Sequence, residues 1–147
     1  MEFKKVQKVF KVMAMKGSGE FENFGTEVPK MAQLFLTRKN EIQNVTSIEV
    51  ALFEPKRDVN HEKGFYYVGL LLSETPEVVP SRMEFLEESR EYVTVRGNMR
   101  EVGKLHQHLS QWSEENGHIR DSESLIVETY HPLPNGEEEI EIYLPLK

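Results

Sequence analysis

An internal repeat constrains this chain more than any other feature of its sequence. Each half carries the same predicted order of elements: strand, helix, strand, strand. Three short stretches also align in the same order and with nearly the same offset: Glu27–Gln33 with Glu101–Gln107, Ile48–Pro55 with Leu125–Pro132, and Tyr67–Gly69 with Tyr143–Pro145. The sequence therefore predicts one domain over residues 1–147, built from two related units at about 8–73 and 83–147.

Hydrophobic periodicity places the elements within each unit. Alternating apolar residues predict strands at 9–15, 47–54, 65–73, 125–131 and 140–146, with a broken strand at 83–87 and 92–96. Apolar residues three or four apart predict helices at about 26–40 and from Asn98 to Gly117. Gly17-Ser18-Gly19 is predicted to be a turn or bulge.

Two such units predict an α+β fold. Duplicated β-α-β-β units related by pseudo-twofold symmetry can pair their strands into one antiparallel sheet. Both helices then lie on one side of the sheet, and we expect a ligand groove on the other side.

Glu128 is a carboxylate within an otherwise apolar predicted strand, so its presence there needs an explanation. It shares one face of an apolar strand with Tyr130, because side chains alternate along a strand. The repeat aligns Glu128 with Ala51, so the fold does not require an acid at this position. The predicted ligand-binding residues on this face are one carboxylate and four aromatic residues: Glu128, Tyr130, Tyr143, Tyr67 and Phe53.

A carboxylate among aromatic rings is suited to a cationic or amphipathic small molecule. Ring faces attract a cation by about 0.5–2 kcal/mol each, and the carboxylate supplies a full charge. A partly buried acid would also have a raised pKa, as a general acid or base requires. The alternative is that this face is solvated and Glu128 has no ligand, because sheets with one wet face are common.

Composition excludes several other classes. The net charge of −7 argues against direct binding to nucleic acid, and the absence of cysteine excludes disulfides and thiolate chemistry. The first residues lack a signal-peptide pattern, and no apolar run reaches membrane-spanning length, so we expect a cytoplasmic protein without membrane contact. No metal or cofactor site is predicted, and His106 and His108 are expected to be exposed polar residues of a helix.

The sequence resembles the GyrI-like, or bacterial transcription activator effector-binding, domain family over nearly its whole length. The resemblance is carried by Met83–Glu87 with Tyr92–Val95 and Gly97, by Val127–Tyr130, and by Ile140–Lys147. It implies a duplicated β-α-β-β fold with a groove between the halves. In drug-binding members of that family, a glutamate matching Glu128 and an aromatic residue matching Tyr143 form the pocket for cationic drugs.

The resemblance leaves three functions open. The first is a stand-alone domain that binds a small-molecule effector, in a multidrug or toxin response or in transcription regulation; no helix-turn-helix precedes the first predicted strand, so a complete transcription factor is not expected. The second is a hydrolase of strained electrophilic small molecules that uses Glu128. The third is a protein-binding module such as a gyrase modulator, which would act through a protein partner. Whether the chain is an enzyme, and its oligomeric state, stay undecided at this point.

Overall fold

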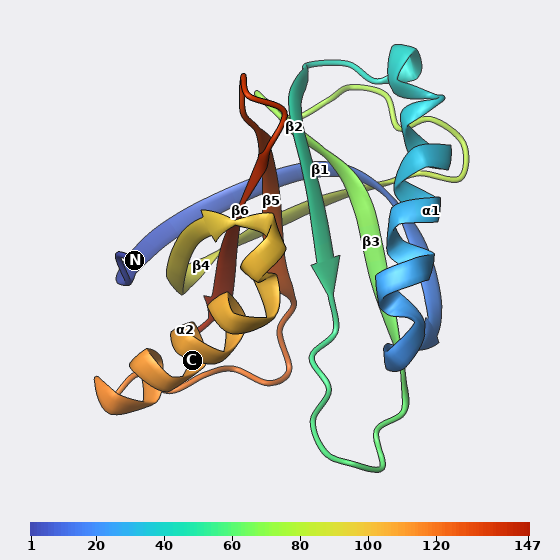
Figure 1. The fold of residues 1–147 in the computed structure, drawn as a ribbon. Coiled ribbons are helices and arrows are strands. Elements are labelled where there is room, and N and C mark those ends of the chain that lie inside the picture. Colours follow the sequence, from blue (N-terminus) through green and yellow to red (C-terminus); the bar gives the residue numbers. More distant parts are fainter.

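The order β-α-β-β occurs twice along the chain (Figure 1). The structure, a computed structural model, describes residues 1–147. The first four main elements are β1 (Lys4–Glu20), α1 (Phe24–Leu36), β2 (Val45–Phe53) and β3 (Lys63–Leu72). The second four are β4 (Glu84–Asn98), α2 (Val102–Glu115), β5 (Ile126–Pro132) and β6 (Glu138–Pro145). Short 3-10 turns precede or follow the helices at Phe21–Asn23, Lys39–Glu41 and Met99–Glu101.

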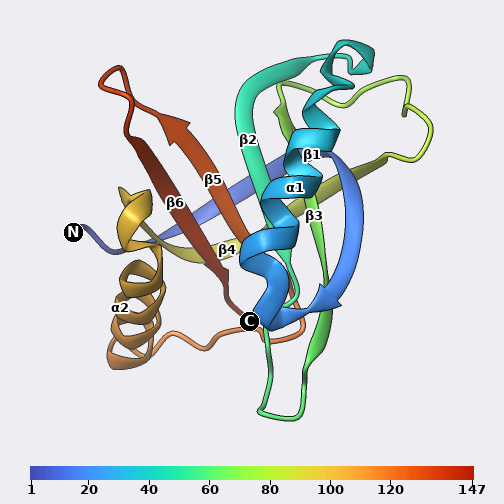
Figure 2. The same ribbon diagram turned by 45° about the vertical axis from the view of Figure 1, so that its right-hand side comes forward.

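All six strands form one closed antiparallel sheet in the order β1-β3-β2-β5-β6-β4. The order is pseudo-twofold symmetric. Exchanging each strand of the first half for its equivalent in the second (β1 for β4, β2 for β5, β3 for β6) gives the same order read from the other end. Both helices lie on the outer side of the sheet, α1 against β1 and β3 and α2 against β4 and β6, with β2 and β5 between them (Figures 1 and 2). The predicted α+β class, with an antiparallel sheet and two helices on one side, is confirmed.

The inner face of the closed sheet holds a core to which every strand contributes. Within it, Phe10 meets Tyr92 and Tyr143 edge to face, with ring centroids 5.5 and 4.9 Å apart. Closure removes sheet edges, so this face is packed with side chains and has no room for a groove. Its buried residues are Phe10, Val12, Ala14, Val50, Leu52, Tyr67, Tyr92, Val127 and Tyr143.

The outer face carries two further cores, one under each helix. Phe35 of α1 is buried over Met13, Tyr66 and Val68. Leu105 and Leu109 of α2 are buried in a second cluster with strand residues such as Ile142. The apolar stripes predicted for both helices therefore face the sheet, as helical spacing requires. No helix is both long enough and apolar enough to cross a lipid bilayer.

Two predicted element boundaries are wrong. Gly17-Ser18-Gly19 continues strand β1 and pairs with β3 instead of forming a turn. These glycines allow close approach, because a Cβ on Gly17 would lie 2.5 Å from the Tyr66 ring and one on Gly19 would lie 2.5 Å from Glu27. The polar residues 88–91 do not interrupt the strand either, because β1 pairs with β4 along that stretch.

Gly69, in the middle of β3, provides a test of this packing. A Cβ there would lie 2.1 Å from the backbone oxygen of Met13, whereas a Cβ on Gly103 in α2 would meet nothing within 4 Å. Gly69→Ala should lower the free energy of unfolding by about 1–3 kcal/mol, since neither neighbouring strand can move freely. Gly103→Ala should raise it by up to about 1 kcal/mol. Urea denaturation checks both values, and equal stability of the two variants would contradict the packing described here.

Candidate ligand-binding groove

The strand register divides the five predicted site residues between two faces. Residues directly opposite each other on antiparallel strands point the same way. Glu128 lies opposite Ala51 on β2 and opposite Ile142 on β6, so these side chains share the outer face. Phe53 and Tyr130, each two residues away along its strand, point to that face as well.

The prediction that Tyr67 and Tyr143 share this face is wrong. Tyr67 lies opposite Leu52, and Tyr143 lies opposite Val127, so both rings point into the closed sheet. They are 8% and 5% exposed there. The physical reason is that both faces of this sheet are buried, so apolar alternation alone does not distinguish the inner face from the outer face.

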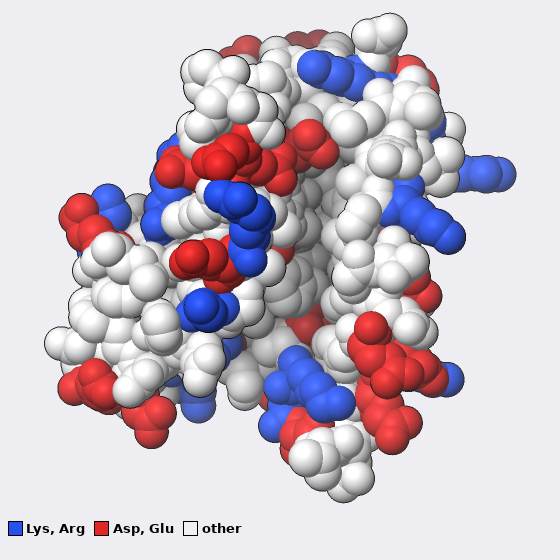
Figure 3. All heavy atoms as spheres, in the orientation of Figure 1, with Lys and Arg blue, Asp and Glu red and all other residues white.

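The groove was predicted on the face opposite the helices, but the apolar hollows lie between the helices. Two open hollows of about 640 and 680 Å³ follow one another between α1 and α2 and share Val28, Pro29, Ala51, Met99 and Tyr130. We call them together the interhelical groove. Figure 3 shows the depression between the two helices, with mostly uncharged atoms in it and acidic side chains gathered near its upper end.

Glu128 lies in the floor of the interhelical groove and is 8% exposed. Its two carboxylate oxygens have different partners. Tyr130 donates its hydroxyl hydrogen to Oε1 at 2.6 Å, and Nε2 of His106 lies 2.5 Å from Oε2. Both partners are uncharged when the imidazole is neutral, so the carboxylate has no obligatory counter-ion.

His106 was expected to be an exposed polar residue of the helix, and that expectation is wrong. Its side chain is 28% exposed, and its ring lies 6.3 Å from the ring of Phe53. One signal could have found it. His106 follows the groove residue Val102 by four residues, and residues at i and i+4 share a helix face.

Tyr130 remains a neutral hydrogen-bond donor over a wide pH range. Burial first, and then the charge of Glu128, raise the pKa of Tyr130 well above its ordinary value. The phenol therefore stays protonated at neutral pH and keeps its hydrogen bond to Glu128. Tyr130 is one of the five residues that line both hollows of the groove.

The groove is acidic along its length. Glu49 and Glu138 line the 640 Å³ hollow, Glu128 lines the 680 Å³ hollow, and no lysine or arginine lines either one. Burial, and then the nearby Glu138, raise the pKa of Glu49. The remaining lining is mostly apolar: Phe24, Val28, Pro29, Ala32, Phe35, Leu36, Val50, Ala51, Phe53, Val68, Met99 and Val102. No group of three or more His, Asp or Glu side chains is arranged to hold a metal ion.

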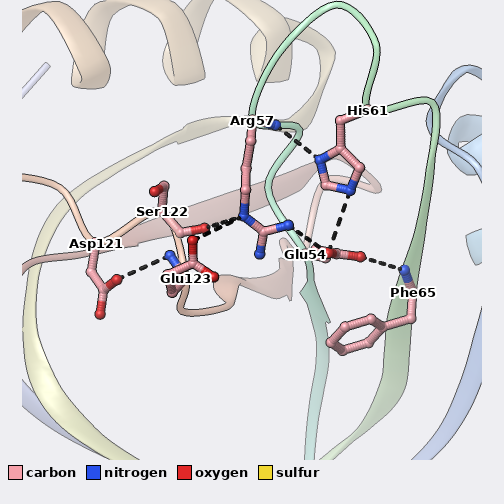
Figure 4. A network of polar contacts seen from close by, with 7 residues as sticks. All are labelled: Glu54, Arg57, His61, Phe65, Asp121, Ser122 and Glu123. Carbon is pink, nitrogen blue, oxygen red and sulfur yellow. Dashed lines mark hydrogen bonds and ion pairs between the residues drawn. The ribbon is translucent and has the colours of Figure 1, made fainter.

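A polar network at one end of the sheet holds β2 against β5 (Figure 4). Glu54, directly after β2, accepts a hydrogen bond from Arg57 at 2.7 Å and one from the Phe65 amide at 3.2 Å. Arg57 also donates to the backbone oxygen of Ser122, just before β5, at 3.0 Å. Burial raises the pKa of Glu54, but these hydrogen bonds lower it by more, so the pKa lies below its ordinary value. The network helps to fix the register that places Glu128 opposite Ala51.

Comparison with known proteins supports the fold at low sequence identity. No protein-family model matches the sequence, and no curated protein matches it. Three similar solved structures are SAV2435 bound to tetraphenylphosphonium, the EcmrR C-terminal domain, and a hydrolase from Listeria innocua. Their TM-scores are 0.71, 0.66 and 0.60, at 13%, 14% and 14% identity.

The match is to the whole chain in each case. It covers 100% of this chain and 94% of SAV2435, 100% and 99% for the EcmrR domain, and 99% and 92% for the hydrolase. These neighbours are consistent with the GyrI-like effector-binding fold that the sequence resembles. At such identities they establish the fold alone.

The raised pKa of Tyr130 predicts a loss of stability at alkaline pH. Below about pH 10 the phenol is protonated in both states. Above it, the unfolded chain releases the proton while the folded protein retains it, so the free energy of unfolding falls as pH rises. Between pH 9 and 11, Tyr130→Phe should lose less stability than the wild type, by up to about 1.4 kcal/mol. Urea denaturation at both pH values checks this, and equal losses would contradict the burial of the phenol.

Proposed function

We propose that this protein binds a cationic or amphipathic small molecule in the interhelical groove. The observation that carries the proposal is Glu128, a carboxylate with 8% exposure in the floor of an apolar groove that no lysine or arginine lines. A cation there would gain a full opposite charge at low local dielectric, which strengthens the attraction relative to water.

The walls of the groove favour a ligand that is also apolar. Phe24 and Phe53 offer ring faces, while Val28, Pro29 and Met99 offer aliphatic and thioether surface. Methionine adapts its shape to different ligands, and aromatic faces attract cations. Glu49 and Glu138 add negative charge farther along. A lipophilic cation satisfies all of these features at once, whereas an anion satisfies none.

One structural neighbour supports this class of ligand, and a second supports a link to transcription. SAV2435 binds tetraphenylphosphonium, a lipophilic cation, and the EcmrR domain belongs to a protein solved in complex with DNA. In our proposal the present chain is a GyrI-like effector-binding domain whose occupancy reports on such compounds in a multidrug response or in transcription regulation. Of the five predicted site residues, Glu128, Tyr130 and Phe53 contact the ligand.

Replacement of Glu128 by glutamine tests the proposal. The amide oxygen can still accept the hydrogen bond from Tyr130, but the charge is gone. We expect the variant to bind tetraphenylphosphonium about ten-fold or more weakly, a loss of about 1.4 kcal/mol or more. Binding of the neutral triphenylphosphine oxide should change little. Isothermal titration calorimetry measures both.

A matched control is Glu114→Gln, which removes an exposed glutamate of α2 outside the groove. It changes the net charge of the protein by the same amount, so it isolates the local effect of Glu128. The proposal is contradicted if the wild type does not bind the cation, or if both glutamine variants weaken it equally.

One observation favours a second function, hydrolysis of a strained electrophile. His106 and Glu128 are 2.5 Å apart, and such a pair can move a proton between a water molecule and a leaving atom. In this reaction water adds its oxygen to the electrophilic carbon, the strained bond breaks, and the released atom takes up the proton. The catalytic residue would be Glu128, with His106 as its proton partner.

Incubation with styrene oxide tests this second function. A hydrolase should form the diol at a rate that falls at least about 100-fold in Glu128→Gln, the size expected for loss of a general acid or base. A circular dichroism spectrum confirms that the variant is folded. If the wild type binds tetraphenylphosphonium but forms no diol above the protein-free rate, the binding function stands and hydrolysis of this substrate class is excluded.

A further inference from the structure

His106 is the residue of α2 whose side chain makes a polar contact with the carboxylate in the floor of the groove. The 2.5 Å contact between its Nε2 and Oε2 of Glu128 places the hydrogen on Nε2 when the ring is neutral. Nδ1 is then the nitrogen that gains or loses a proton. Histidine is the side chain that ordinarily changes charge between pH 5 and 8.

The charge of the site therefore depends on one proton. With a neutral ring, His106 and Glu128 together carry −1, and with a protonated ring they carry zero. Tyr130 does not alter this sum, because burial and Glu128 keep its phenol neutral.

Few other charges face His106. On its own helix the residues three and four positions away are Val102, Gly103, Leu109 and Ser110, none of them charged. The side chains of β4 and β6 that pack under α2 are apolar: Val93, Val95, Ile140, Ile142 and Leu144.

The groove and the turn before α2 add few charged groups near His106. The hollow beside Glu128 has no other charged residue in its lining, from α1, β2 or the turn that precedes α2. Arg100 of that turn is paired with Glu137 at 2.9 Å. Glu128 and Tyr130 are therefore the titratable groups that His106 faces.

We propose that His106 determines when the groove accepts a cation, because binding of a cationic ligand is coupled to release of the proton on His106. This rests on the proposed binding function. A cation next to Glu128 is attracted by the pair at −1 and gains little from the neutral pair, so it binds preferentially to the deprotonated state. The coupling is reciprocal. A proton on His106 lowers the affinity for the cation by the same factor by which the bound cation lowers the affinity of His106 for the proton.

The ligand affinity should consequently rise with pH. One released proton corresponds to at most a ten-fold change in affinity per pH unit, and couplings between neighbouring sites are about five-fold or more. The wild-type protein should therefore bind tetraphenylphosphonium about five-fold or more tightly at pH 8 than at pH 5.5. Triphenylphosphine oxide, which is uncharged, should bind equally at both pH values.

His106→Gln separates this coupling from other titrations. Its amide nitrogen can still donate to Glu128, but it takes up no proton between pH 5 and 8. The variant should bind the cation with nearly the same affinity at pH 5.5 and 8. Calorimetry in phosphate and Bis-Tris buffers at pH 6.5, which differ in ionisation enthalpy, should detect proton release on binding for the wild type and none for the variant.

His108→Gln is the matched control, because His108 is an exposed histidine two residues further along α2. This variant should keep the pH dependence of the wild type. If the dependence persists in His106→Gln, another group such as Glu49 is responsible and the proposal is overturned. Tight binding by the wild type with the same affinity at both pH values would overturn the coupling alone. Absence of cation binding at pH 8 would overturn the proposed function and the coupling with it.

Discussion

The pairing of β2 with β5 is the interaction on which the rest of the structure depends. Together with the pairing of β1 with β4 it joins the two halves into one closed sheet, and it places Ala51 directly opposite Glu128. Cβ atoms of such opposite residues are about 4.5–5.5 Å apart, so a second glutamate at position 51 would put two like charges side by side. A small neutral residue avoids that repulsion and leaves space beside the carboxylate. Because the first unit has Ala51 where the second has Glu128, the groove holds one negative charge at this pair of positions instead of two that repel each other.

The surroundings of Glu128 explain how a carboxylate can persist in an apolar groove without an arginine or lysine. Buried charges are costly unless hydrogen bonds satisfy them, and here two uncharged donors serve the two oxygens. Neutral donors compensate for lost water without cancelling the negative charge. The groove thus keeps an electrostatic preference that a salt bridge would have removed.

The fold does not by itself specify what happens at Glu128. At 13–15% identity, the neighbours share the fold but have different names, including a hydrolase from Listeria innocua and the EcmrR C-terminal domain. A fold of this kind supports several functions, which depend on the side chains of the site. In this chain the polar side chains in or beside the groove are Glu128, His106, Tyr130, Glu49 and Glu138, and the proposal of a cationic ligand rests on them.

The sequence by itself determined the element order, the α+β class, the apolar stripes of both helices and the placement of Glu128, Tyr130 and Phe53 on one face of the sheet. These features are local, because periodicity and strand alternation are properties of neighbouring residues. Only the tertiary structure decided which sheet face is inside. Closure of the sheet buries Tyr67 and Tyr143 in the interior and leaves the groove between the helices. It also brought His106 to Glu128, a contact across 22 residues that depends on how α2 packs and that no local pattern specifies.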